Sequence, residues 1–355
     1  MAAEPELFDL IGKRGHEQVL FTREPTSGYK GIIAIHNTNL GPALGGTRFW
    51  NYQSDRAALV DVLRLSRGMT YKAAVAGLNL GGGKSVIIGD PKIAQRELIM
   101  RAHGRAVETL GGRYITAEDV GTSVEDMDFV HMETDHVVGM AGKSGDPSPV
   151  TAYGTYRGVQ ASAARRYGSD DLNGRSVMVQ GAGHVGYYLC GLLAGDGAKV
   201  FIADIDEAKV GRVVEDFGAT AIDADDVYEA DVDIFAPCAL GAVLNDDTIP
   251  KLRVQIVAGA ANNQLAKLEH AQQLKDAGIL YAPDYVINAG GLINVYSELA
   301  GWSLDRSKRK AGEIYATMLQ IFELAAERGI TNAEAADQVA LRRVERVAKL
   351  HSSWV

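Results

Sequence analysis

The chain has 355 residues, and because single domains commonly hold about 100–200 residues, its length favours two domains. Its 45 acidic and 36 basic residues give a net charge of −9, which argues against a surface that binds nucleic acid or an anionic membrane. Cys190 and Cys238 are its two cysteines, and no Cys/His cluster has metal-ligand spacing, so we expect neither a bound metal nor a disulfide framework.

The first part of the chain reads as a mixed α/β domain. Its N-terminus lacks the basic and then apolar order of a secretory signal, and no apolar run reaches about 18 residues, so we expect a cytoplasmic protein. Alternating apolar residues predict strands at 16–21 and 30–36, and helical periodicity predicts helices at about 56–69 and 95–111. The segment Gly145–Pro149 interrupts this pattern, so the first domain is expected to span residues 1–148.

Two lysines in this domain are candidates for chemistry. Lys72 and Lys84 are predicted on adjacent strands joined by the turn 77–83, which would let both face one cleft. A phosphate-binding loop ending at Gly83-Lys84-Ser85 would need glycine at position 78, where the chain has Leu78. Asp119 is a third candidate. The alternatives are that the lysines are solvated charges and that Asp119 caps a helix.

The second part contains a glycine-rich loop between a predicted strand and a predicted helix. The loop Gly181-Ala-Gly-His-Val-Gly186 follows the apolar run 176–180 and precedes a helical pattern at 187–193. Its three glycines fit a tight turn, a close approach to a pyrophosphate and close helix packing. Apolar runs at 199–203, 232–236, 254–258 and 279–282 alternate with helical stretches. This rhythm predicts a doubly wound parallel sheet, a Rossmann-like domain over 149–331.

A carboxylate follows the next strand and indicates which dinucleotide binds. Asp204 ends the run 199–204, roughly 20 residues beyond the glycines, where an acid meets the ribose 2′-hydroxyl. Asp204 would repel a 2′-phosphate, so we predict NAD rather than NADP. The alternative is a glycine-rich turn without a ligand. The amphipathic segment 332–355 is predicted to be helical and could pack on either domain.

Several separate segments resemble the amino-acid dehydrogenase family that includes the glutamate, leucine, valine and phenylalanine enzymes. The resemblance covers nearly the whole chain and implies two α/β domains separated by a cleft, a homo-oligomer, and a substrate, catalytic and oligomerisation role for the first domain. The segments are Leu40–Arg48, Gly68–Lys72, Gly81–Lys84, Ala117–Gly121, Ala236–Ala239, Ala260–Asn263 and Ala282–Gly291.

The resemblance also implies roles for individual residues. Lys72 would bind the substrate α-carboxylate, Lys84 would be the catalytic lysine, and Asp119 would move protons at the amino group. Gly45 and Gly46 would supply backbone contacts to the substrate. The implied cofactor contacts are Gly181, Ala182, Gly183, His184, Val185, Gly186, Asp204, Ile205, Thr151, Cys238, Ala239, Asn262 and Asn288, with Asn262 near the substrate as well and Asn288 near the nicotinamide.

The implied reaction is oxidative deamination, which needs a base near neutral pH. An unperturbed lysine, with a pKa of about 10.4, is protonated and cannot serve. Burial and a second cation both lower a lysine pKa, and we predict that Lys72 supplies this neighbouring charge to Lys84. Asp119 would then pass protons between the amine and solvent.

The predicted substrate side chain is apolar. Glutamate-specific members of the family carry a lysine directly before the Gly-Gly pair, where this chain has Leu44. We expect branched-chain amino acids with overlapping use of leucine, valine and isoleucine, because one methylene changes selectivity by only about 1–3 kcal/mol. The alternatives are a phenylalanine dehydrogenase and a catalytically silent NAD-binding protein. The pocket residues are predicted to be Leu44, Ala117, Leu292 and Val295, with Met69 and Thr134 at its rim, unless they only pack the core.

Overall fold

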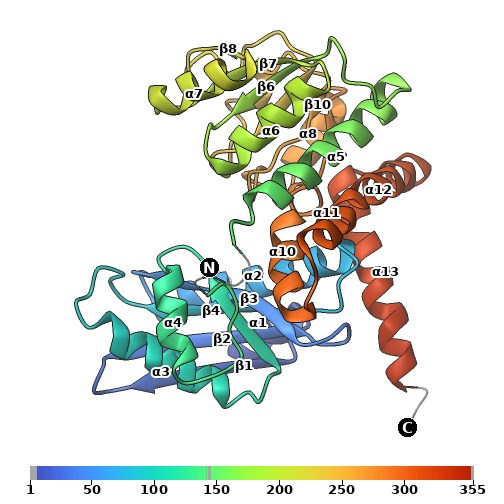
Figure 1. Cartoon of the computed structure of the whole chain (residues 1–355). Coiled ribbons are helices and arrows are strands. Elements are labelled where there is room, and N and C mark those ends of the chain that lie inside the picture. Colours follow the sequence, from blue (N-terminus) through green and yellow to red (C-terminus); the bar gives the residue numbers. More distant parts are fainter. Residues whose placement is uncertain (1–5, 141, 143–144, 353–355) are drawn as a thin grey trace. The chain divides into compact units, whose positions relative to one another are not determined.

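The computed structural model describes residues 6–140, 142 and 145–352 and divides the chain into two compact units (Figure 1). Unit 1 holds the residues up to Gly145 and those from Ala340 onward, and unit 2 holds Asp146–Val339. The boundary therefore lies three residues before the one expected from the sequence. The last part of the C-terminal helix belongs with unit 1.

Unit 1 is built on a five-stranded mixed sheet. Its strands are β1 (Gln18–Glu24), β2 (Tyr29–Asn37), β3 (Ala43–Trp50), β4 (Gly81–Ile88) and β5 (Tyr114–Glu118), in the order β1-β2-β4-β3-β5. β1, β2 and β4 are antiparallel neighbours, whereas β3 runs parallel to both β4 and β5. The helices are α1 (Leu7–Lys13), α2 (Asp55–Val75), α3 (Arg96–Glu108) and α4 (Val124–His131).

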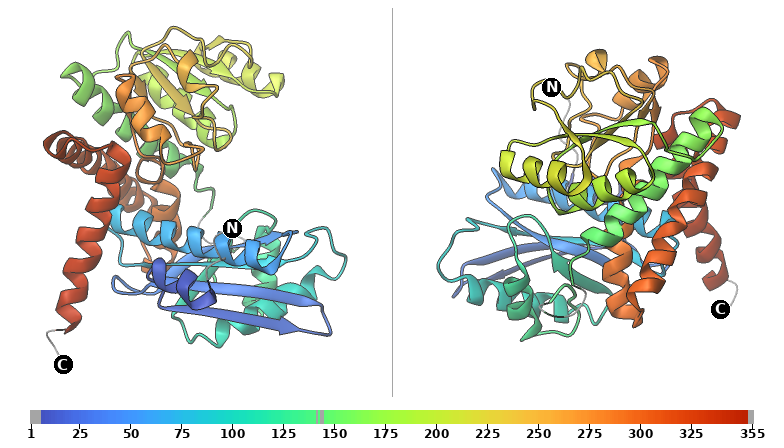
Figure 2. Two further views of the ribbon diagram at one scale, coloured as in Figure 1. Left: turned by 180° about the vertical axis from the view of Figure 1, so that it is seen from behind. Right: turned by 45° about the horizontal axis from the view of Figure 1, so that its top comes forward.

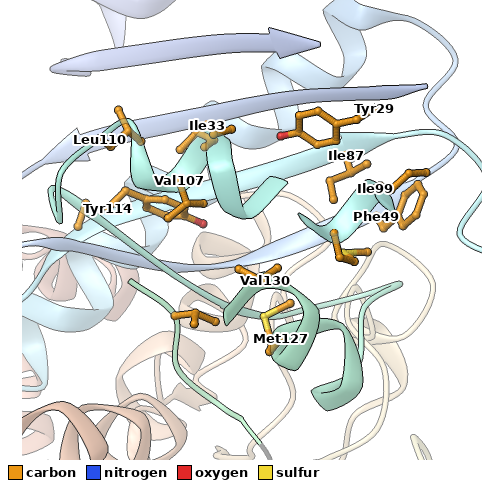
Figure 3. Close-up of a cluster of buried hydrophobic side chains, with 14 of the residues drawn as sticks. Tyr29, Ile33, Phe49, Ile87, Ile99, Val107, Leu110, Tyr114, Met127 and Val130 are labelled. Atoms are coloured by element: carbon orange, nitrogen blue, oxygen red, sulfur yellow. The ribbon is translucent and has the colours of Figure 1, made fainter. Parts of the chain in front are cut away.

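Successive residues of a strand point to opposite sides of the sheet, and β2 carries apolar residues on both sides. Helices therefore cover both faces of this sheet. Ile32 and Ala34 of β2 pack in one cluster with residues of α2, and Figure 2 shows α2 lying along that face. Ile33 and Ile35 belong to the cluster formed with α3 and α4, part of which Figure 3 shows. We call these two sides the α2 face and the α3 face.

The helix α2 is longer than the sequence predicts, and this changes the place of Lys72. Lys72 lies in the last turn of α2 and not on a strand. Gly68 and the β-branched Thr70 weaken the helical pattern locally, but the segment packs tightly against β4. A Cβ on Gly82 would lie 2.1 Å from the Thr70 nitrogen, so only glycine permits this approach. Tertiary packing therefore overrides the weak local preference.

Unit 2 contains a six-stranded parallel sheet in the order β11-β10-β9-β6-β7-β8. This is the strand order of a dinucleotide-binding Rossmann fold, with its switch point between β6 and β9. The predicted fold class is confirmed. The strands are β6 (Ser176–Gln180), β7 (Lys199–Ala203), β8 (Thr220–Ala221), β9 (Ile234–Pro237), β10 (Ile256–Val257) and β11 (Leu280–Tyr281).

Helices flank the sheet of unit 2 and continue beyond it. The helices are α5 (Ser148–Tyr167), α6 (His184–Gly195), α7 (Glu207–Phe217), α8 (His270–Asp276), α9 (Asp284–Ile287), α10 (Gly290–Ala300), α11 (Leu304–Gly312), α12 (Ile314–Arg328) and α13 (Asn332–Ser352), with a short 3₁₀ turn at Ile249–Lys251. Within the described residues no helix is long and apolar enough to cross a membrane. The same residues contain no group of His, Cys, Asp or Glu side chains that could hold a metal ion.

Candidate active site

The register of the unit 1 sheet brings several predicted site residues onto its α2 face. Thr47 hydrogen-bonds to both Ser85 and Thr116 on the α3 face, so the neighbours of these residues along each strand point the other way. The pairing aligns Leu44 with Gly82 and Gly46 with Ala117. Leu44, Gly46, Lys84 and Ala117 therefore share the α2 face.

The glycine pair permits a close approach between the three strands of the site. A Cβ on Gly45 would lie 1.8 Å from the Gly83 oxygen, and one on Gly46 would lie 2.3 Å from the Glu118 oxygen. Any larger residue would push β3 away from its neighbours. Only glycine at these two positions lets the backbone of β3 pack this closely beside β4 and β5.

A cluster of charges occupies the same face. Lys84 Nζ lies 3.0 Å from Asp119 Oδ2, and Arg48 Nε lies 3.0 Å from that same oxygen. The Lys84 side chain is only 7% exposed. Arg48 also contacts Asp61 Oδ2 at 3.0 Å through Nη1, and Tyr52 donates to that oxygen. The cluster thus alternates positive and negative groups from β4, β3, α2 and the turn after β5.

These surroundings shift the pKa values of the central pair. Burial lowers the pKa of Lys84, and the Arg48 guanidinium lowers it further, although Asp119 opposes both effects. Burial alone would raise the pKa of Asp119, but Lys84 and Arg48 outweigh it and hold that pKa below its usual range. The sequence predicts Lys72 as the cation next to Lys84. In the structure Arg48 is a neighbouring cation that lowers the pKa of Lys84.

The turn that carries Asp119 is fixed by hydrogen bonds to β3. Thr122 Oγ1 accepts from the Asp119 nitrogen at 2.8 Å and donates to the Thr47 oxygen at 2.9 Å. Arg96 donates to the Gly121 oxygen at 2.6 Å. Gly121 has φ +81°, and a Cβ there would lie 2.0 Å from the Phe49 oxygen, so glycine is required.

A buried polar network supports these strands from the α3 face. His103 Nε2 lies 2.8 Å from Thr47 Oγ1, which in turn lies 2.6 Å from Ser85 Oγ. Tyr114 donates to the Gly45 oxygen at 2.6 Å, directly behind the glycine pair. Burial lowers the pKa of His103 to about 3, so the ring is neutral near pH 7. The network ties β3, β4 and β5 together next to Lys84.

Lys72 and Met69 lie three residues apart on α2 and therefore on one side of that helix. Both side chains are half-buried. The C-terminal end of α2 is capped by Arg343, which donates to the oxygens of Ala74 and Leu78 at 3.2 and 2.7 Å. A cation at this end complements the helix dipole and its free carbonyls.

In unit 2 the glycine loop has the geometry that a pyrophosphate site needs. Gly181 has φ +107°, which allows the tight turn after β6. A Cβ on Gly186 would lie 1.9 Å from the Gly181 oxygen, whereas a Cβ on Gly183 would meet no atom within 4 Å. Gly183 is the N-cap of α6, so the helix begins at His184 with Val185 in its first turn. The space beside Gly183 fits a phosphate.

The acid at the end of β7 lies against this loop. Asp204 Oδ2 accepts from the Ala182 nitrogen at 2.7 Å, which places the carboxylate beside the dinucleotide loop. Two predicted contacts are exposed: Ile205 is 95% exposed, and the His184 side chain is 84% exposed. His184 Nδ1 lies 3.6 Å from Asp146.

The residues after β9 and β10 lie near the same end of the sheet. The Cys238 nitrogen donates to Gln180 at the end of β6, and Ala239 lies beside Gly181. Asn288 donates through Nδ2 to Asn262 Oδ1 at 2.8 Å and to the Ala260 oxygen at 3.1 Å. Its Oδ1 is buried without a hydrogen-bond partner in the described residues. This orphaned acceptor fits a carboxamide donor of a ligand.

The predicted contacts from α5 and α10 lie at the beginnings of these helices. A Cβ on Gly290 would lie 2.4 Å from the Val150 oxygen, and one on Gly291 would lie 3.2 Å from Thr151 Oγ1. Thr151 therefore lies beside the N-terminus of α10. Leu292 and Val295 follow on α10, three residues apart, and Leu292 is buried.

Comparison with known proteins decides the family. A model described as the dimerisation domain of Glu/Leu/Phe/Val dehydrogenase matches residues 16–136. A second model, described as Glutamate/Leucine/Phenylalanine/Valine dehydrogenase, matches residues 202–352. The chain belongs to this dehydrogenase family. It is an amino-acid dehydrogenase, which confirms the predicted enzyme class, and the family depends on NAD(P).

Relatives within the dehydrogenase family match over nearly their whole length. The leucine dehydrogenase of Bacillus subtilis is 54% identical over 99% of this chain and 97% of its own. The valine dehydrogenase of Streptomyces virginiae is 50% identical over 93% of this chain and 94% of its own. The crystal structure of L-tryptophan dehydrogenase from Nostoc punctiforme has a TM-score of 0.89 and 46% identity, and covers 97% of this chain and all of that one.

The structure places Thr134, one of the predicted pocket residues, beside the C-terminal end of α3. Thr134 donates a hydrogen bond to Glu108 Oε2 at 2.6 Å, and Glu108 is the last residue of α3. Because Val137 pairs with Thr116, Thr134 lies near the beginning of β5, whereas Asp119 follows the end of that strand. Instead the pairing of Val137 with Thr116 puts Val138 beside Ala117, on the α2 face. Val138 is buried. The spacing of residues in the loop before Val138 does not reveal which loop residue pairs with β5.

Arg48 and Asp61 are further site residues that the sequence reasoning missed. Arg48 closes the glycine-rich element 40–48 that carries the family resemblance, and it lies two residues after Gly46. Period-two alternation along a strand therefore places both on one face. That signal was available for Arg48. Nothing in the sequence pairs Arg48 with Asp61, because α2 brings that carboxylate in from a separate element.

Proposed function

We propose that this protein catalyses the reversible NAD-dependent oxidative deamination of leucine, valine and isoleucine to 2-oxo acids and ammonia. The observation that carries the proposal is the buried Lys84 paired with Asp119 beside the closely packed glycine pair of β3. Leucine and valine dehydrogenases at 54% and 50% identity support the substrate class. A cytoplasmic homo-oligomer is proposed with it, supported by the match to a dimerisation domain.

In the proposed mechanism Lys72 binds the α-carboxylate and the backbone of Gly45 and Gly46 contacts the amino group. Lys84, with its lowered pKa, takes a proton from the substrate amine and releases it to solvent through Asp119. The neutral Lys84 then takes a proton from the water that attacks the imine carbon. Asp119 accepts and returns protons at the amine and the carbinolamine. Two ionisable groups with different surroundings thereby take different roles.

The residues of unit 2 fit NAD, which when bound supplies a hydride acceptor for the hydrogen on Cα. The Gly183 loop would hold the pyrophosphate, and Asp204 would accept from the ribose hydroxyls. Asn288 Oδ1 would accept from the carboxamide and thereby orient the ring. Further proposed cofactor contacts are Gly181, Ala182, His184, Val185, Gly186, Ile205, Thr151, Cys238, Ala239 and Asn262.

Aliphatic specificity is proposed to come from the side chains around the glycine pair. Leu44 and Ala117 are buried on the α2 face, where a lysine in place of Leu44 would favour an acidic substrate. Val138 takes the place predicted for Thr134. We also propose that Met69, Leu292 and Val295 contact the substrate side chain.

A substrate panel tests this proposal. NADH formation is measured at alkaline pH with L-leucine, L-valine, L-isoleucine, L-phenylalanine, L-tryptophan and L-glutamate, each with NAD or NADP. We expect the branched-chain substrates with NAD to give the highest kcat/KM. Faster turnover of phenylalanine or tryptophan would contradict the specificity, and turnover of none would leave a silent NAD-binding protein.

The role of Lys84 is tested by a pair of lysine variants. Lys84→Ala should lower kcat by about 10²–10⁴-fold, because a positioned general base contributes that much. Lys30→Ala is the matched control, since Lys30 is exposed on β2 and is outside the charge cluster. An undiminished rate in Lys84→Ala would contradict the assigned chemistry.

A further inference from the structure

Arg48 connects the catalytic pair to a second carboxylate. Its Nε contacts Asp119 Oδ2 at 3.0 Å and its Nη1 contacts Asp61 Oδ2 at 3.0 Å. Lys84 Nζ lies 3.0 Å from the same oxygen of Asp119. Both cations therefore share Oδ2. Within the part of the chain that the structure describes, Oδ1 pairs with no side chain, and we assign it to the substrate amine.

Asp61 in turn is held in place by two further groups. Tyr52 donates to Asp61 Oδ2 at 2.8 Å, and Arg64 contacts Asp61 Oδ1 at 3.0 Å. The planar guanidinium of Arg48 is thus fixed between two carboxylates that come from different elements. A lysine could not match this arrangement, because only a guanidinium presents several donors in a rigid plane.

We propose that Arg48, anchored by Asp61, is a positioning residue for the catalytic pair: it fixes Asp119 Oδ2, and its charge favours release of the proton that Lys84 and Asp119 share. This inference rests on the proposed function of Lys84 and Asp119. It goes further by assigning a task to a residue that does not touch the reacting atoms.

The charges around the pair act in opposite directions. Arg48 lowers the pKa of both Lys84 and Asp119, whereas Asp61 raises the pKa of Lys84. At the end of β5, burial and the nearby Asp119 raise the pKa of Glu118. Ionisable groups on the elements around the pair include Lys84, Glu118, Asp119, Arg48, Tyr52, Asp61, Arg64 and Lys72.

Three variants test this inference through the pH dependence of kcat/KM for deamination. Arg48→Gln removes the cation, so the limb on which the rate rises with pH should move up by about one pH unit, and kcat should fall about tenfold or more. Asp61→Asn removes the opposing anion, so the same limb should move down. Arg64→Gln is the matched control, because Arg64 contacts Asp61 but has no contact with Asp119.

The direction of each shift separates positioning from a structural role. If Arg48 only stabilised the fold, kcat would fall while the profile stayed in place, and that result would overturn the inference. An equal shift of the pH profile in Arg64→Gln would overturn the inference as well. The loss of any nearby positive charge would then explain the shift, without a direct contact to Asp119. If Arg48→Gln does not fold, a downward shift in Asp61→Asn supports the inference, and its absence refutes it.

A second readout does not depend on turnover. The rate at which acetic anhydride acetylates Lys84, followed by peptide mass spectrometry across pH, reports the pKa of that amine. We expect the midpoint to rise by about one unit in Arg48→Gln, with Lys30 as the internal reference. An inactive native protein would refute the proposed function, whereas an unshifted Lys84 midpoint would refute the role of Arg48 alone.

Discussion

At the scale of single residues, the proposed chemistry depends on an amine and a carboxylate whose surroundings shift their pKa values. Lys84 is buried and points at Asp119, and Arg48 adds a second positive charge to the same oxygen. Burial disfavours the charged form of Lys84, while Asp119 favours it. Both pKa values therefore lie below their usual ranges, which favours release of a proton from Lys84.

Replacing Asp119 by asparagine tests this balance. We expect Asp119→Asn to lower kcat by about 10²–10⁴-fold, because the proton acceptor at the amine is lost. Asp119 raises the pKa of Lys84 in the native protein, so its removal should move the rising limb of the pH–rate profile to lower pH. Steady-state kinetics from pH 6 to 11 measure both effects. A shift of the rising limb to higher pH would contradict the assigned effect of Asp119 on the pKa of Lys84.

At the scale of elements, glycine positions decide how closely backbones approach. Gly82 brings α2 against β4, Gly45 and Gly46 bring β3 against its neighbours, and Gly186 brings α6 against the turn after β6. The first two contacts place Lys72 and Lys84 on one face of the sheet. The third forms the loop that is proposed to bind NAD.

Two helical glycines of unit 2 allow a matched comparison. Gly186→Ala should destabilise the protein by about 1–3 kcal/mol and weaken NADH binding, because its Cβ would lie 1.9 Å from the Gly181 oxygen. Gly211→Ala, on α7, meets no atom within 4 Å and should stabilise the protein by about 0.5–1 kcal/mol. Urea unfolding and NADH fluorescence titration measure both. Equal effects in the two variants would contradict this explanation.

At the scale of the whole molecule, acid stability is expected to depend on neutral histidines buried in unit 1. Burial lowers the pKa of His16 and of His36 to about 4, and that of His103 to about 3. His36 Nδ1 lies 2.8 Å from Thr70 Oγ1 on α2, so protonation would disturb the helix that carries Lys72.

The free energy of unfolding should therefore fall as the pH drops from about 6.5 towards 4. In this window the unfolded chain takes up protons at its histidines, whereas the folded chain resists protonation because the folded pKa values are lower. Urea unfolding at several pH values, followed by hydrogen exchange in peptides of unit 1, measures the slope. His36→Asn should flatten it, and His184→Asn, at an exposed position, should not. A slope of zero in the native protein would refute the prediction.

The sequence by itself determined the features that depend on local pattern. Apolar periodicity and the spacing from Gly181 to Asp204 indicated a doubly wound dinucleotide domain, because strand, turn and helix signals there are contiguous in the chain. Lys84 and Asp119 were identifiable from the motifs that contain them. The prediction that Leu44 favours an apolar substrate also came from the sequence, because Leu44 directly precedes the glycine pair.

Only the tertiary structure decided the features that depend on pairing between distant segments. The continuation of α2 through Lys72 is stabilised by packing on Gly82. Local helix propensity therefore did not predict this part of α2. The position of Val138 beside Ala117 follows from a bridge between Thr116 and Val137. The contact from Asp61 through Arg48 to Asp119 joins three elements. Strand register and helix docking are long-range choices, and no local spacing encodes which side chains they bring together.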